Sequence, residues 1–328
     1  MTEFADKYVN LASPKLGCEV VFATDDSFAA KERMIQDHDP IWVPDKYDTY
    51  GKWMDGWESK RRRDGRHDWA IIKLGVMGVI EAVDIDTSHF TGNYPPAVMI
   101  EASASEDQPT KDSQWFTILA PTSLGPNASH VREVSYNQPV NWLRVHMLPD
   151  GGIARLRVYG KPFCDWSTKD PDEIHELSLM VNGARVLGYN DAHYGKVWSI
   201  LTEGRGENMG DGWETRRRRE PGNDWVVVSL GQKGTVERIE VDTCHFKGNF
   251  PESCAIDAAC VDFGTTESII TQSMIWGRLM ERKKLSADNI HIFTKEELNE
   301  FGPITHVRLN IYPDGGISRF RVFGKLAD

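Results

Sequence analysis

One stretch of sequence occurs twice in this chain and determines its architecture. Residues 54–102 read MDGWESKRRRDGRHDWAIIKLGVMGVIEAVDIDTSHFTGNYPPAVMIEA, and residues 210–258 read GDGWETRRRREPGNDWVVVSLGQKGTVERIEVDTCHFKGNFPESCAIDA. The copies align without a gap at a constant offset, which separates Asp55 from Asp211 and His89 from His245. Because self-similarity at one fixed spacing is the signature of repeated structural units, the sequence predicts a tandem duplication.

The length of the chain supports two domains. Its 328 residues exceed the roughly 250–300 at which one hydrophobic core stops growing, so each copy is expected to bury its own core. The segment FCDWSTKDPD, residues 163–172, is polar and rich in turn formers, as domain linkers are. We therefore predict domains at residues 1–168 and 169–328.

Composition excludes several classes of protein. The net charge of -11 argues against a general nucleic-acid partner. No apolar run is long enough to span a bilayer, and the polar, acidic opening does not resemble a signal peptide, so a cytoplasmic protein is expected. The five cysteines form no CxxC pair and are predicted to be free thiols. A homo-oligomeric state is left open.

The apolar pattern of each copy predicts β-structure. DWAIIKLG and DWVVVSLG read as strands closed by Gly75 and Gly231, and alternating strands follow them. The Pro-Asp-Gly-Gly sequences at 149–152 and 313–316 are expected to be hairpin turns between antiparallel strands. Many short strands without a βαβ rhythm indicate an all-β fold, with one β-sandwich in each half. A minor helix is expected over 173–181.

The DGWESKRRR and DGWETRRRR motifs place a tryptophan and a glutamate beside clustered guanidinium groups. Arginine is well shaped to hold a planar carboxylate bidentately, so these motifs favour a small anionic ligand. The alternative is that each glutamate neutralises the arginines while the tryptophan packs beneath them. Arg62 and Arg218 are expected to face away from the ligand. The candidates are Trp57, Glu58, Arg61 and Arg63, with Trp213, Glu214, Arg217 and Arg219 in the second copy.

The DTSHFTGNYP and DTCHFKGNFP motifs are predicted to lie where a strand enters a loop. Histidine exchanges a proton near neutral pH, aspartate orients it, and asparagine hydrogen-bonds a urea-like group. The alternative assigns these side chains to capping the turn and bonding the loop backbone. The candidates are Asp86, His89 and Asn93, with Asp242, His245 and Asn249 in the second copy.

Two further observations bear on the site. Of the arginines that alternate along the strands, we favour only Arg144 and Arg308 as ligand contacts. HxxxH, HExxH and CxxC spacings are missing, so no metal or cofactor is predicted, although a divalent metal is left open. The first copy has ten extra residues within positions 35–53, which are expected to wall one side of its site and make the copies unequal.

Taken together, the tandem DGWE(S/T)xRRR, DWxxxxLG, DTxHFxGNxP and PDGGIxRxRV(Y/F)G motifs resemble the allantoicase family from the first residues to Lys325. The resemblance implies two jelly-roll domains of the galactose-binding-like class. It also implies a hydrolase that converts allantoate to ureidoglycolate and urea in purine degradation. For that reaction we expect His89 or His245 to protonate the departing urea nitrogen.

Two other functions stay open at this point. A tandem sandwich of this kind is also suited to binding a ligand without chemistry, because fold alone does not decide function. A related ureide hydrolase that depends on a metal is the second alternative.

Overall fold

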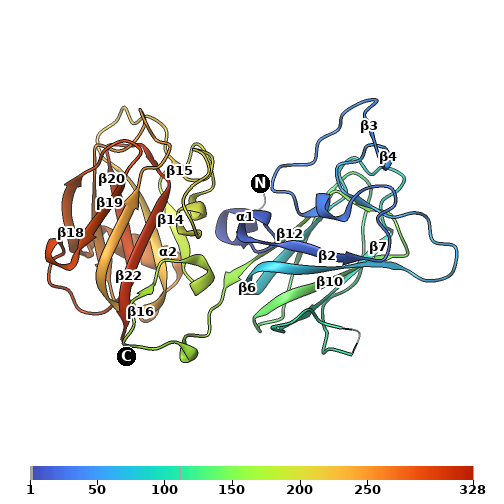
Figure 1. Cartoon of the computed structure of the whole chain (residues 1–328), viewed down its shortest axis with the longest axis horizontal. Coiled ribbons are helices and arrows are strands. Elements are labelled where there is room, and N and C mark those ends of the chain that lie inside the picture. Colours follow the sequence, from blue (N-terminus) through green and yellow to red (C-terminus); the bar gives the residue numbers. More distant parts are fainter. Residues whose placement is uncertain (1–2, 111, 328) are drawn as a thin grey trace. The chain divides into compact units, whose positions relative to one another are not determined.

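The chain forms two compact units, Met1–Phe163 and Cys164–Asp328. This computed structural model describes residues 3–110 and 112–327. Both units are built mainly from strands, with only short helices beside them (Figure 1). The predicted all-β duplication is confirmed. Along the chain, the boundary between the units falls at the start of the 163–172 segment.

The first unit is an antiparallel sandwich preceded by the helix α1 (Glu3–Lys7). Its short 3-10 helices are η1 (Pro14–Leu16) and η2 (Lys31–Ile35). Its strands are β1 (Val9–Asn10), β2 (Glu19–Ala23), β3 (Tyr47–Asp48), β4 (Gly51–Lys52), β5 (Trp57–Glu58), β6 (Asp68–Asp86), β7 (Ala97–Ser103), β8 (Phe116–Ser123), β9 (Ser129–Glu133), β10 (Val140–Leu148), β11 (Gly152–Ile153) and β12 (Arg155–Pro162).

The second unit has the same strand order in its main sheet, has no counterpart of β3 and β4 among the described residues, and adds the helix α2 (Thr266–Gln272). Its 3-10 helices are η3 (Trp166–Thr168), η4 (Met180–Asn182), η5 (Val197–Leu201), η6 (Ser273–Ile275) and η7 (Lys295–Glu297). Its strands are β13 (His175–Glu176), β14 (Arg185–Tyr189), β15 (Trp213–Glu214), β16 (Asp224–Asp242), β17 (Ser253–Ala259), β18 (Gly277–Lys284), β19 (Ile290–Thr294), β20 (Ile304–Tyr312), β21 (Gly316–Ile317) and β22 (Arg319–Leu326).

The strand β6 belongs to both layers of the first sandwich. Its first part pairs with β2 and β10, and its second part pairs with β9 and β12. The strand β16 does the same in the second unit. The sequence prediction that Gly75 ends a strand was therefore wrong. A Cβ at Gly75 would lie 2.5 Å from the carbonyl oxygen of Leu16, so glycine serves a close approach between backbones.

The Pro-Asp-Gly-Gly turn joins the two layers and does not form the predicted hairpin. β10 pairs with β6 and β7, whereas β12 pairs with β6 and β1. The turn's last glycine begins β11, which pairs with β5 so that Gly152 lies opposite Glu58. The hairpin prediction was wrong because the two flanking strands, β10 and β12, each pair with β6 and not with each other. As a result, the turn lies beside the glutamate of the DGWE motif.

The helix predicted over 173–181 was also wrong. That stretch holds β13, which pairs with β22, and the start of η4. Leu177 is fully buried and its amide donates to the carbonyl of Val322, so tertiary packing extends the chain here. The helix α2 lies elsewhere, capped by the Thr265 side chain.

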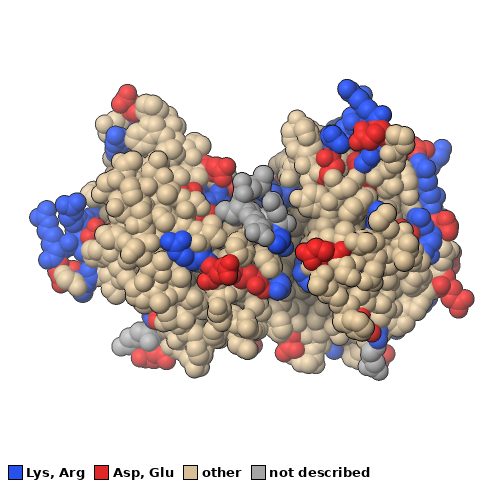
Figure 2. Space-filling model, turned by 180° about the vertical axis from the view of Figure 1, so that it is seen from behind, with Lys and Arg blue, Asp and Glu red and all other residues tan. Residues whose placement is uncertain are grey.

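The charged surface, the helices and the cysteines can be compared with what the composition predicted. Basic and acidic side chains are interspersed on the face seen in Figure 2. Among the described residues, no helix has the length and apolarity needed to cross a membrane. All five cysteines are free thiols, as predicted: Cys18, Cys164, Cys244, Cys254 and Cys260.

Candidate functional site

The DGWE segment is held in place by backbone contacts that recur in both copies. The Trp57 indole donates to the carbonyl of Asp25 at 2.8 Å, and the Lys60 amide donates to the Asp25 carboxylate at 2.9 Å. In the second copy Trp213 and Arg216 make the same contacts with Asp191. These bonds fix the course of the chain into the arginine run.

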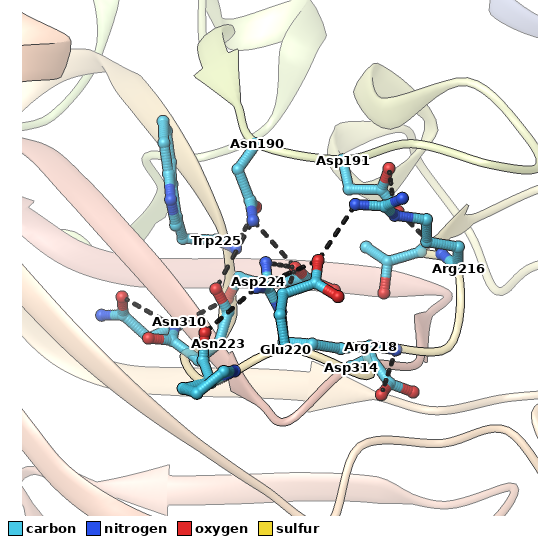
Figure 3. A network of polar contacts seen from close by, with 12 residues as sticks. Asn190, Asp191, Arg216, Arg218, Glu220, Asn223, Asp224, Trp225, Asn310 and Asp314 are labelled. Carbon is cyan, nitrogen blue, oxygen red and sulfur yellow. Dashed lines mark hydrogen bonds and ion pairs between the residues drawn. The ribbon is translucent and has the colours of Figure 1, made fainter.

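One arginine of each run, at matched positions in the two copies, is structural. Nε and Nη2 of Arg62 donate to Oδ1 of Asp68 at 2.9 and 2.5 Å, and Asp68 has no exposed surface. Arg218 holds Asp224 in the same way, at 3.1 and 2.6 Å (Figure 3). The Arg62 amide also donates to Asp150 of the Pro-Asp-Gly-Gly turn. The arginine run is therefore anchored through its centre.

The outer arginines Arg61, Arg63, Arg217 and Arg219 are exposed. Within residues 3–110 and 112–327, their guanidinium groups have neither a hydrogen bond nor an ion pair. These four guanidinium groups are therefore without a partner in the described part of the chain, whereas Arg62 and Arg218 are held by buried aspartates.

A glutamate and an asparagine form the polar centre of each candidate site. Nδ2 of Asn93 donates to Oε1 of Glu58 at 2.6 Å, and Asn249 donates to Glu214 in the same way. Glu58 is only 9% exposed. Burial raises the pKa of its carboxyl, and the hydrogen bond from Asn93 opposes that shift. A carboxyl group whose pKa is raised by burial is suited to proton transfer near neutral pH.

The Pro-Asp-Gly-Gly turn positions this pair. Gly315 has φ 139°, and a Cβ there would lie 2.6 Å from the Pro251 nitrogen and 2.8 Å from the Asn249 carbonyl oxygen. Only glycine fits this conformation and this approach. The Gly315 carbonyl accepts from the Thr215 amide, and the Gly315 amide donates to the Thr215 hydroxyl. The residue after each glutamate, Thr215 or Ser59, is therefore hydrogen-bonded to the turn that supports the asparagine loop.

In the second unit these groups line an open cavity of about 810 Å³. Its walls include Glu214, Arg217, Arg218, Asn249, Asp314 and Lys284. Arg218 thus lines the cavity that it was expected to face away from, and Arg219 does not line it. Glutamate, asparagine and an unpaired arginine, predicted from two separate motifs, are thus brought to one cavity. A volume in this range is sufficient for a small polar metabolite.

The aspartate and histidine of the DTxHF motif have the capping role that the sequence left as an alternative. Asp86 accepts from the Ser88 amide at 2.7 Å, and Nε2 of His89 bonds the carbonyl oxygen of Pro40 at 3.2 Å. Asp242 accepts from the Cys244 amide, and His245 bonds the carbonyl oxygen of Gly206 at 2.7 Å. The predicted Asp–His orientation was wrong, because each aspartate closes a turn.

The loop also separates these residues from the asparagine of the same motif. Asn249 lines the large cavity, whereas Asp242 lines a different one of about 210 Å³. His89 and His245 both have φ 70°, in the left-handed region that marks a tight turn. The glutamate therefore lines the same cavity as the unpaired Arg217, whereas Asp242 of the DTxHF motif does not.

Trp57 and Trp213 do not provide the predicted ligand floor. Both side chains have no exposed surface, and each indole N–H is already bonded to a carbonyl. They pack beneath the site as core residues.

The remaining predicted arginines are held by partners within the protein. Arg144 pairs with Glu101 at 2.6 Å and lies over the ring of Trp115, 4.6 Å from its centroid. Arg308 is 9% exposed, donates to Asn310 and Ser273, and lies over Trp225. The structure places neither in the cavity that Glu214 lines.

The structure reveals a histidine network that the sequence analysis missed. Nε2 of His146 donates to Glu101 at 2.8 Å, and its Nδ1 shares a 2.9 Å hydrogen bond with Nε2 of His67. The pKa of His146 is lowered, and burial is the largest cause. The hydrogen bond to Glu101 acts in the opposite direction. In the second unit Asn310 donates to Asp257 at 2.8 Å and accepts from Asn223 at 3.4 Å. In the aligned copies His67 and His146 of the first correspond to Asn223 and Asn310 of the second. This paired difference was the sequence signal that could have revealed the network.

The ten extra residues of the first copy pack near the DTxHF turn. The Ile41 amide donates to Asp55 at 2.9 Å, and the ring of Trp42 lies 6.2 Å from that of His89. Arg157 pairs with Asp39. The insertion therefore contacts residues around His89.

In the part of the chain that the structure describes, no three His, Cys, Asp or Glu side chains are arranged to hold a metal ion.

Similarity to known proteins agrees with this architecture. The model of the allantoicase repeat matches residues 9–163 and 175–327. The chain belongs to the allantoicase family. A probable allantoicase of Photobacterium profundum is 52% identical over 320 residues, covering 97% of each chain. A probable allantoicase of Burkholderia mallei is 51% identical over 325 residues, covering 99% of this chain and 96% of that one.

A solved structure extends the family relationship to the fold. The crystal structure of allantoicase from Saccharomyces cerevisiae matches with a TM-score of 0.80 and 36% sequence identity. The match covers 96% of this chain and 92% of the yeast chain. The two allantoicase repeats of the family are thus the two sandwiches described above.

Proposed function

We propose that this protein hydrolyses allantoate to ureidoglycolate and urea at the Glu–Asn–Arg sites beside the Pro-Asp-Gly-Gly turns. The observation that carries the proposal is the cavity of the second unit, where Glu214 is held by Asn249 next to the unpaired Arg217. Allantoate is a small anion with one carboxylate and two ureido groups. A free guanidinium suits its carboxylate, and a positioned carboxyl group suits its ureido nitrogen.

The reaction requires two proton movements, and one glutamate can carry both. In this proposal the glutamate, Glu58 in the first unit or Glu214 in the second, donates a proton to the ureido nitrogen as the bond between that nitrogen and the central carbon breaks. The resulting carboxylate then takes a proton from the water that adds to this carbon. Urea and ureidoglycolate leave, and the glutamate is again protonated. The predicted histidine donor is replaced by the glutamate because each histidine bonds a backbone carbonyl.

The asparagine acts as a positioning residue in this proposal. Its amide N–H bonds the glutamate, where the sequence analysis had assigned it to the ureido oxygen. Holding one carboxylate oxygen directs the other toward the cavity, and preorganised groups lower the barrier more than mobile ones.

The test measures urea and ureidoglycolate from allantoate with the full-length protein. The Glu58→Gln/Glu214→Gln double variant keeps the shape of both sites and is expected to lose about 10²–10⁴-fold in kcat. The matched control is His89→Asn/His245→Asn, which is expected to lower stability and leave the pH profile of kcat unchanged. If the histidine variant lost the chemical step while the glutamate variant retained the parental rate, the assignment of roles would be wrong.

Two alternatives are tested in the same assay. Parental protein that binds allantoate and releases no urea would be a binding module. Activity that disappears with a chelator and returns with a divalent ion would identify the metal-dependent hydrolase. A cytoplasmic location and a homo-oligomeric state stay predictions.

A further inference from the structure

The rims of the two candidate sites differ in charge. The second cavity is bordered by Glu252, which directly precedes β17, and by Lys284 at the end of β18. Equivalent backbone hydrogen bonds define matching positions in the two copies. The Leu285 amide donates to the Glu252 carbonyl, and the Leu124 amide donates to the Pro96 carbonyl, both at 3.0 Å. Pro96 and Ser123 therefore occupy the positions of Glu252 and Lys284 in the first unit.

Most of the extra charge on the second rim is internally paired. Arg282 pairs with Glu252 at 2.6 Å, and the Ser253 hydroxyl donates to the same carboxylate at 2.9 Å. Lys284 acts on Glu252 only at longer range, where it helps to lower the pKa of that carboxyl. Within the described residues, the side chain of Lys284 makes no hydrogen bond and no ion pair. It is the net positive charge that distinguishes the second rim from the first.

The direction of Lys284 is set by the strand. Ser253 lies opposite Lys284 and Cys254 lies opposite Lys283 in the β17–β18 register. Because neighbouring side chains on a strand point to opposite faces, Lys283 leaves the cavity and pairs with Glu297 at 3.3 Å. Lys284 lines the cavity together with Arg217. Two unpaired cations thus border one cavity.

We infer that Lys284 is a specificity-determining residue that binds the substrate carboxylate together with Arg217, so the second repeat is the high-affinity site. This inference rests on the proposed function and identifies the residues that bind the carboxylate of its substrate. Two cations around one cavity favour a carboxylate over a neutral ureide, since charge-assisted hydrogen bonds are the strongest available contacts. Ser123 supplies only a hydroxyl, so the first repeat binds allantoate more weakly. This reverses the asymmetry expected from the ten-residue insertion.

The experiment isolates each repeat by disabling the other. In the Glu58→Gln background, turnover comes from the second repeat, and Lys284→Ser is expected to raise KM for allantoate about 10- to 100-fold with little change in kcat. Lys283→Ser in the same background is the matched control and should leave KM unchanged. In the Glu214→Gln background, Ser123→Lys is expected to lower KM.

A binding measurement separates this inference from the proposed function. Calorimetry with the Glu58→Gln/Glu214→Gln variant should show tight allantoate binding that Lys284→Ser weakens. The carboxamide analogue of allantoate should bind weakly with or without Lys284. An unchanged KM and an unchanged Kd after Lys284→Ser, in protein that still releases urea, would overturn the inference alone. Absence of urea from the parental protein would instead overturn the proposed function.

Discussion

Replacing Arg62 by methionine should destabilise the first unit much more than replacing Arg61. Arg62 makes two hydrogen bonds to Asp68, whose side chain is fully buried. The other carboxylate oxygen, Oδ2, has no hydrogen-bond partner among the described residues. Methionine would leave this buried charge with only the Thr24 hydroxyl, which donates to Oδ1 at 2.7 Å.

The magnitude follows from the geometry. Removing one partner of a buried ion pair costs about 3–5 kcal/mol, because an uncompensated charge stays in the interior. Arg62 keeps 18% of its side chain exposed and Thr24 remains, so the lower limit of about 3 kcal/mol applies. With a urea m-value of about 2 kcal/mol/M, the unfolding midpoint of the first unit should fall by about 1.5 M.

Urea denaturation followed by tryptophan fluorescence measures this shift. Arg61→Met is the matched control and should change the free energy of unfolding by less than about 0.5 kcal/mol, because its side chain is exposed and unpaired. Adding Asp68→Asn to Arg62→Met should recover part of the loss, since it removes the buried charge. Equal effects of Arg61→Met and Arg62→Met, or no recovery in the double variant, would refute the reasoning.

Three further predictions concern other residues. Gly315→Ala places a Cβ against the Asn249 loop, so it should lower both the melting temperature and kcat, while retained activity would contradict the support role of the turn. The pKa of His306 is lowered to about 4 by burial. The folded state then binds fewer protons than the unfolded state, and about 3 kcal/mol of stability present above pH 6.5 should be lost as the pH falls toward 4. His306→Gln should flatten this dependence in pH-dependent unfolding, and an unchanged profile would contradict it. His67→Asn/His146→Asn imitates the second unit and should change the free energy of unfolding by less than about 1 kcal/mol, whereas loss of folding would show that the first unit does not tolerate the polar network of the second.

The sequence by itself determined the duplication, the all-β class and the residues that recur in both copies. These follow from local pattern, because alternation of apolar residues and glycine-rich turns depends on near neighbours. Glu58, Asn93 and Arg61 were among the candidates for the same reason. Their repetition at matched positions, Glu214, Asn249 and Arg217, was visible without coordinates.

Only the tertiary structure decided which partner each side chain takes. His89 bonds the Pro40 carbonyl, 49 residues away in the chain, and the indole N–H of Trp57 donates to the Asp25 carbonyl. The Pro-Asp-Gly-Gly turn joins two layers because β10 and β12 both pair with β6. Lys284 lines the cavity because the register of β17 and β18 turns Lys283 away. Such contacts depend on distant segments that packing brings together, and a pattern of neighbouring residues carries no information about them.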